Sequence, residues 1–133
     1  MSRESKLIPV STKDAPAAIG PYSQAIRTGQ FLFLSGQIPL DPVGGTIVGT
    51  TVEEQTTQVL KNISGVLKSQ GLSLSNVVKS TVFLKNMADF TKFNAVYESH
   101  LRAPFPARST VEVARLPKDA LVEIETIAVF PDA

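Results

Sequence analysis

Residues 51–84 read TVEEQTTQVLKNISGVLKSQGLSLSNVVKSTVFL, and this stretch decides the fold class. Thr51 followed by Glu54 fits a capping box, in which two side chains satisfy backbone donors at the start of a helix. Apolar residues then recur at helical spacing: Val52, Val59, Leu60, Ile63, Val66 and Leu67. Gly71 stands where a left-handed residue commonly ends a helix. The β-rich run 77–84 follows, so the sequence predicts a helix and then a strand with one apolar face made of Val78, Val82 and Leu84.

On the N-terminal side the pattern is typical of short strands. Lys6–Val10 is expected to form an edge strand, where Pro9 is tolerated. Ser23–Arg27 and Phe31–Ser35 flank Thr28-Gly29-Gln30 and predict a hairpin. A turn over 41–45 precedes Ile47 and Val48, which can add a further short strand.

On the C-terminal side a second helix is expected to start at Asp89 as its cap. It carries the apolar residues Phe90, Phe93, Val96, Tyr97 and Leu101. Pro104 and Pro106 would end it. Arg108–Ala114 and Leu121–Phe130 alternate as strands, with a turn over 116–119 between them.

This order of elements predicts a single α+β domain over 1–133, with two helices packed on one face of a mixed sheet. One layer of helices leaves the other sheet face bare. On the last strand that face carries Leu121, Ile127 and Val129. A partly apolar face without cover predicts an oligomer.

Composition excludes several classes of function. The 133 residues carry a formal net charge of +1 and no cysteine, which removes disulfides, thiolate metal sites and cysteine nucleophiles. No basic stripe calls for a nucleic-acid partner. No segment approaches the roughly 20 apolar residues that span a bilayer, and Met1–Val10 does not resemble a secretory signal. We therefore expect no membrane contact and a cytoplasmic protein, with a mitochondrial location open in a eukaryote.

The inventory of reactive side chains is also narrow. His100 is the only histidine, and carboxylates do not cluster around it in the sequence, so no metal site is expected. A ribonuclease mechanism that needs two histidines is excluded within one chain. Gly44, Gly45 and Gly49 fit neither the dinucleotide-binding nor the P-loop spacing, so no cofactor is expected.

Arginine, glutamate, tyrosine, hydroxyl and backbone groups remain. Arg108 follows a proline turn at the start of a strand, where its fork can bind a carboxylate or simply face solvent. Glu123 shares a strand face with Glu125, and that face can be catalytic, solvated or covered by another copy. Tyr22 follows Gly20-Pro21 and fits either a pocket or a packed turn. In Ser35-Gly36-Gln37 the glycine permits close backbone approach.

Together the motifs resemble those of the RidA (YjgF-type) family. The resemblance rests on APAAIGPYSQ at 15–24, SGQIP at 35–39, VVKSTVFL at 77–84 and FNAVYE at 93–98. It continues through FPARS at 105–109 and VARLPKD at 113–119 to VEIE at 122–125. The match runs from about Asp14 to Val129.

The resemblance implies a chorismate-mutase-like α+β fold and a homotrimer with sites in the clefts between subunits. The family's carboxylate-binding arginine falls on Arg108, its acidic residue on Glu123, and its pocket tyrosine, from the subunit across the cleft, on Tyr22. Further cleft positions fall on Ser35, Gly36 and Asn94. Thr110 stands where family members often carry a cysteine, which removes a thiol from the site.

The implied activity is cofactor-independent hydrolysis of 2-iminobutanoate and 2-iminopropanoate to 2-keto acids and ammonia. The imines would come from pyridoxal-phosphate dehydratases acting on serine or threonine. Two alternatives stay open. One is an endoribonuclease or translation inhibitor, an activity also attached to this family. The other is a non-catalytic protein that binds small molecules or holds unfolded clients.

Overall fold

The computed structural model describes residues 6–131, which form one six-stranded sheet and two α-helices. The strands follow the order β1-β2-β3-β6-β4-β5 across the sheet. Their bounds are β1 Ile8–Val10, β2 Ala25–Thr28, β3 Phe31–Gln37, β4 Val77–Leu84, β5 Ala107–Glu112 and β6 Val122–Val129. The helices are α1 Val52–Ser69 and α2 Phe90–His100. Residues 1–5 lie outside the described residues. They belong to Met1–Val10, the segment compared above with a secretory signal.

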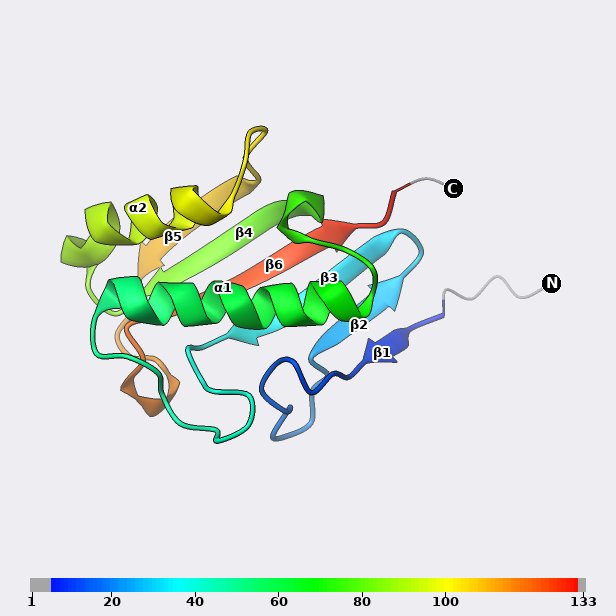
Figure 1. The fold of residues 1–133 in the computed structure, drawn as a ribbon, viewed down its shortest axis with the longest axis horizontal. Coiled ribbons are helices and arrows are strands. Elements are labelled where there is room, and N and C mark those ends of the chain that lie inside the picture. Colours follow the sequence, from blue (N-terminus) through cyan, green and yellow to red (C-terminus); the bar gives the residue numbers. More distant parts are fainter. Residues whose placement is uncertain (1–5, 132–133) are drawn as a thin grey trace.

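Both helices lie on the same face of the sheet, as Figure 1 shows. Helix α2 connects β4 to β5, which pair in parallel, whereas the other neighbouring strands are antiparallel. The predicted α+β class, the mixed sheet and the single helical layer are thus confirmed. The hairpin predicted around Thr28-Gly29-Gln30 joins β2 to β3, with Gly29 at φ +59°.

Helix α1 forms for the reasons that its sequence indicates. Thr51 and Glu54 make the reciprocal capping bonds, and Gly71 follows the helix with φ +73°. The apolar face of the helix is buried against the sheet, and Ile63 and Val66 have no exposed surface. Full burial of such side chains contributes roughly 1.5–3 kcal/mol each. On the same helix, Asn62 donates to the Leu40 carbonyl at 2.9 Å and so ties the loop after β3 to the core.

The prediction that Val78, Val82 and Leu84 share one apolar face of β4 is wrong for Val78. Val82 and Leu84 are buried under the helices, but Val78 is exposed on β4. The register with β6 shifts between Val77 and Lys79, and this irregularity turns Val77 inward in place of Val78. An extra residue in one strand reverses the side-chain alternation beyond it.

Two smaller predictions also need correction. Asp89 occupies the position before α2, yet its side chain makes no capping hydrogen bond. A short 3₁₀ helix, Met87–Asp89, comes first, and Asn86 caps it by accepting from Ala88 N at 2.9 Å. The segment 47–48 forms only an isolated bridge between Leu40 and Ile47, because the loop turns away before a second pair can form.

The sheet face away from the helices is open and partly apolar. Phe31 is 49% exposed, Phe33 44% and Val111 42% on this face. The Phe31 and Phe33 rings contact each other with centroids 6.0 Å apart. Within residues 6–131, neither helix is both long and apolar enough to cross a membrane.

Candidate functional site

Arg108 lies on β5 beneath α2. Its strand position pairs with Ser80 of β4, whose side chain is buried under the helices. The guanidinium carbon lies 4.9 Å from the Tyr97 ring centroid, 5.5 Å from Phe93 and 5.6 Å from Phe90. Faces of aromatic rings attract a guanidinium without taking up its hydrogen-bond donors. Three rings therefore orient the arginine and leave its fork available.

The fork of Arg108 lines a hollow of about 460 Å³. The other lining residues are Asn94, Tyr97, Glu98, Phe105 and Pro106. Among residues 6–131 the Arg108 guanidinium forms no ion pair, since the only one found joins Lys85 and Asp119. A cation in such a hollow is suited to bind a carboxylate through two parallel hydrogen bonds.

Two more predicted residues lie in this region and carry unpartnered oxygens. Thr110 follows Arg108 by two positions on β5, and Asn94 lies on α2 at the hollow. The side-chain oxygens Thr110 Oγ1 and Asn94 Oδ1 are buried and have no hydrogen-bond partner among residues 6–131. An unsatisfied buried acceptor costs about 1–3 kcal/mol. A ligand or a second copy that brings donors would remove this cost.

Glu123 projects from the opposite sheet face. Its strand neighbours Val122 and Ile124 are fully buried on the helix side, so Glu123 points away from the helices. Its carboxylate lies directly over Gly36, and a Cβ added at position 36 would collide with it. Pairing of β3 with β6 shifts between Leu34 and Gln37, which places Ser35 and Gly36 in a bulge. Bulges of this kind often re-aim side chains beside active sites.

Burial raises the pKa of the Glu123 carboxyl, and the nearby Glu125 carboxylate raises it further. Both effects disfavour the charged form. A carboxyl with a raised pKa can accept a proton and return it near neutral pH more readily than an ordinary glutamate.

Ser35 lies in the bulge of β3, and Tyr22 lies in the segment before β2. Ser35 Oγ donates to the Ser23 carbonyl at 2.6 Å, which fixes the bulge to the segment before β2. The Tyr22 hydroxyl accepts from Ile19 N at 3.4 Å. Tyr22 lines a separate hollow that includes neither Arg108 nor Glu123.

Apart from Tyr22, the predicted site residues thus fall into two groups on opposite sides of the sheet. The Arg108 group contains Asn94 and Thr110 on the helix side. The Glu123 group contains Gly36, with Ser35 in the same bulge. Strand β4 lies between β5 and β6, and the Arg108 and Glu123 side chains leave the sheet in opposite directions. One chain therefore does not bring its own Arg108 and Glu123 together.

Sequence reasoning missed the aromatic surroundings of Arg108. Phe90, Phe93 and Tyr97 follow one another at helical spacings of three and four, which marks a single face of α2. The sequence contains that spacing. It does not indicate which strand residue lies beneath this face of the helix. Tyr97 also donates from its hydroxyl to Ser80 Oγ at 2.9 Å, which holds the ring in place.

The described residues offer little to a metal ion. His100 is exposed, and its Nδ1 lies 2.9 Å from the Val96 carbonyl oxygen. No three histidine, aspartate or glutamate side chains gather closely enough within 6–131 to hold one. The chemistry available at the two groups is that of a guanidinium, a carboxyl and hydrogen-bonding oxygens.

Comparison with known proteins identifies the family. Residues 12–130 match the model of the family described as Endoribonuclease L-PSP. The chain belongs to the YjgF/RutC/RidA family. A RutC family protein of Pyrococcus horikoshii is 55% identical over 119 residues, covering 90% of this chain and 94% of the relative. The chloroplastic Reactive Intermediate Deaminase A of Arabidopsis thaliana is 52% identical over 119 residues, covering 90% of this chain and 64% of the relative.

Solved structures of the RidA family share the fold. The crystal structure of RidA from the Antarctic bacterium Psychrobacter matches with a TM-score of 0.89 and 40% identity, covering 92% of this chain and 99% of that one. The YjgF gene product of Escherichia coli matches with a TM-score of 0.87 and 46% identity, covering 92% and 98%. The predicted chorismate-mutase-like fold is therefore confirmed.

Proposed function

We propose that this chain is a deaminase that hydrolyses 2-iminobutanoate and 2-iminopropanoate to 2-keto acids and ammonia without a cofactor. The observation that carries the proposal is Arg108, which forms no ion pair within residues 6–131 and is held by three aromatic rings at the wall of a hollow. Its fork matches the carboxylate that both imino acids share. A relative named Reactive Intermediate Deaminase A supports the reaction class.

The proposed site forms between copies of the chain. Arg108 and Glu123 leave opposite faces of the sheet, so a complete site needs Arg108 from one copy and Glu123 from its neighbour. The open face with Phe31, Phe33 and Val111 supports such contacts, because apolar surface of this kind gains free energy when another copy covers it. A homotrimer closes these contacts into a ring with a site at each interface.

In the proposed mechanism Arg108 binds the substrate carboxylate and fixes the imine carbon beside a water molecule. The water oxygen forms a bond to that carbon, and the electron pair of the C=N double bond moves to nitrogen, which takes up a proton. The resulting carbinolamine collapses to the C=O double bond as the C–N bond breaks. One water is consumed, and one keto acid and one ammonia are released.

The other residues have distinct proposed roles. The neighbour's Glu123 accepts a proton from the attacking water and returns it to the leaving nitrogen, for which its raised pKa is suited. Asn94 Oδ1 and Thr110 Oγ1 have no partner within the described part of the chain, and they accept hydrogen bonds from N–H or O–H groups of the reacting centre. Gly36 leaves room for the Glu123 carboxylate, while Ser35 fixes the bulge and Tyr22 shapes the cleft.

The test couples purified protein to a serine or threonine dehydratase and traps free imine with semicarbazide. Wild-type protein should suppress formation of the semicarbazone, and Arg108→Ala should not. Arg102→Ala is the matched control, because Arg102 is exposed and lines a different hollow. It should behave as the wild type.

The outcome separates the alternatives. If Arg108→Ala suppresses trapping as well as the wild type does, the carboxylate-anchor mechanism is wrong. If no form suppresses trapping, the deaminase proposal falls, and the ribonuclease and binding alternatives take its place.

A further inference from the structure

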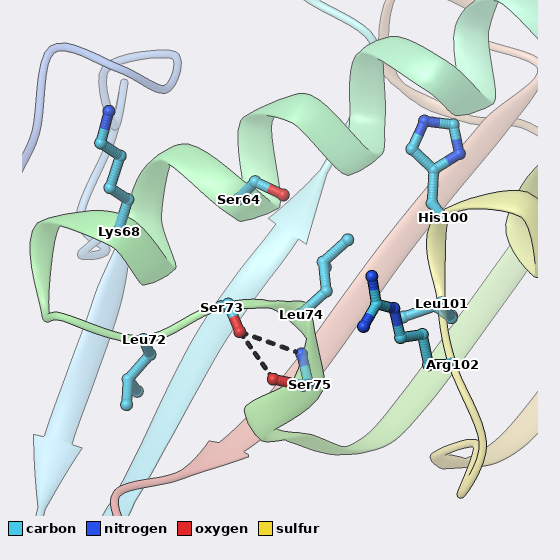
Figure 2. Close-up of a pocket in the computed structure, with 9 residues that line it drawn as sticks. All are labelled: Ser64, Lys68, Leu72, Ser73, Leu74, Ser75, His100, Leu101 and Arg102. Atoms are coloured by element: carbon cyan, nitrogen blue, oxygen red, sulfur yellow. Dashed lines mark hydrogen bonds between the residues drawn. The ribbon is translucent and has the colours of Figure 1, made fainter.

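A second hollow, of about 520 Å³, lies between the C-terminal ends of α1 and α2. Figure 2 shows its lining, which comes from α1, from the turn after it and from the segment after α2. The lining residues are Ser64, Lys68, Leu72, Ser73, Leu74, Ser75, His100, Leu101 and Arg102. None of them lines the Arg108 hollow.

The charged side chains of this hollow are Lys68 and Arg102, and its lining contains no carboxylate. Lys68 stands in the last turn of α1, where a cation offsets the negative end of the helix dipole. Arg102 has no such role, because α2 ends at His100 and its cap is Leu101. The Arg102 guanidinium also forms no ion pair within the described part of the chain.

Two hydroxyl-bearing residues of the turn after α1, Ser73 and Ser75, line the hollow together with Arg102. Figure 2 shows the Arg102 guanidinium directed toward Leu74 and Ser75. Ser73 Oγ accepts from Ser75 N at 3.3 Å and shares a hydrogen bond of 2.7 Å with Ser75 Oγ. Two hydroxyls that bond to each other use only one of their two hydrogens. The second hydrogen remains available for an acceptor in the hollow.

Apolar side chains form the remaining wall. Leu72 is buried, and Leu74 and Leu101 are partly buried against the core. Small-molecule sites commonly combine such a wall with a few polar groups that fix the ligand's orientation. A guanidinium fork, hydroxyl donors and the Lys68 ammonium favour an oxyanion of high charge, and the leucines favour an organic group attached to it.

From this arrangement we infer that the hollow binds a small phosphate monoester, separately from the Arg108 site. The phosphate oxygens accept hydrogen bonds from Arg102 and from the Ser73–Ser75 pair. Lys68 adds positive charge at the rim. The organic group of the ligand lies against Leu72, Leu74 and Leu101.

The test uses phenyl phosphate as the probe and measures its dissociation constant by isothermal titration calorimetry at fixed ionic strength. Wild-type protein is compared with Arg102→Gln, with Lys92→Gln and with Arg108→Ala. Lys92 is an exposed residue of α2 outside the hollow, so its variant controls for the loss of one positive charge. Loss of the Arg102 hydrogen bonds should weaken binding about tenfold or more. Lys92→Gln and Arg108→Ala should stay within about twofold of the wild type.

Three results would overturn the inference. The first is absence of binding to the wild type at millimolar phenyl phosphate. The second is equal weakening by Arg102→Gln and Lys92→Gln, which indicates general charge attraction. The third is loss of binding in Arg108→Ala alone, which places the probe in the other hollow. Thermal unfolding of each variant verifies that the fold is intact. In the imine-trapping assay, Arg102→Gln should suppress semicarbazone formation as the wild type does.

Discussion

The two faces of the sheet differ in what covers them. On one face α1 and α2 bury an apolar layer in which Ile63, Val66 and Val82 have no exposed surface. On the other face Phe31 and Phe33 stand open beside Glu123 and Glu125. Burial on the covered face stabilises the fold of the single chain. The open face is available for contact with a second copy. Each face carries one half of the proposed site, so under the proposal folding, assembly and catalysis depend on the same division.

The largest expected effect is a cavity on the covered face. Ile63→Ala should lower the free energy of unfolding by about 2–5 kcal/mol, because the lost side chain leaves a void between α1 and the sheet. Urea denaturation followed by circular dichroism measures it. Val111→Ala on the open face should change the unfolding of the separate chain by less than about 0.5 kcal/mol. Similar losses for both variants, independent of protein concentration, would contradict the proposed difference between the faces.

A charge on the open face should act on assembly rather than on folding. Phe33→Asp should weaken self-association by roughly 100-fold or more, since covering an unpaired carboxylate costs several kcal/mol. Sedimentation velocity reports the mass, and circular dichroism reports the fold. The control is Val43→Asp, because Val43 is 94% exposed on a loop. If Phe33→Asp assembles as the wild type does, another surface joins the copies.

Gly36→Ala tests the position of the Glu123 carboxylate. The added methyl group would collide with this carboxylate and move it, while Arg108 on the other face stays in place. We expect kcat for imine hydrolysis to fall about tenfold, less than the roughly 100-fold or more that a general base contributes, because the carboxylate is displaced and not removed; KM should be nearly unchanged. Binding of the product 2-ketobutyrate should remain as in the wild type. An unchanged kcat would remove Glu123 from the reaction.

Glu123→Gln should give the smallest effect on stability, and one with a defined pH dependence. The folded state raises the pKa of Glu123 above its ordinary value of 4.5, so ionised Glu123 disfavours folding at neutral pH. This penalty is lost as the pH falls through the raised pKa to below 4.5. The variant should therefore be the more stable protein at pH 7.5, with the difference vanishing near pH 4. A difference that is the same at both pH values would contradict the raised pKa.

Much of the fold could be predicted because local signals agree with one another. The capping pair Thr51 and Glu54, Gly71 after the helix, and the glycine of the β2–β3 turn all perform the predicted roles. The predicted burial face of Val78 was wrong because a shift in register against β6 cannot be inferred from the alternation within one strand. The prediction that Asp89 caps α2 was wrong because Asn86 starts a short 3₁₀ helix one turn earlier.

The candidate site was predictable residue by residue but not in its arrangement. The alternation within a strand indicates which of its residues share a face, so Glu123 could be assigned to the face opposite Val122 and Ile124. It does not tell whether Arg108 on another strand points to the same side. That relation depends on strand order and register, which place Ser80 beside Arg108 and bring Tyr97 over both.

Complementation between two inactive variants tests the central claim most directly. Arg108→Ala and Glu123→Gln chains are produced together with different tags, and mixed assemblies are isolated through both tags. If each site takes Arg108 from one copy and Glu123 from its neighbour, every trimer that contains both variants has one complete site of three, so the isolated mixed assemblies should recover about one third of the wild-type imine hydrolysis. Each variant alone should stay inactive. Mixed assemblies as inactive as either parent would show that both residues must come from the same chain, and the account of a divided site would be wrong.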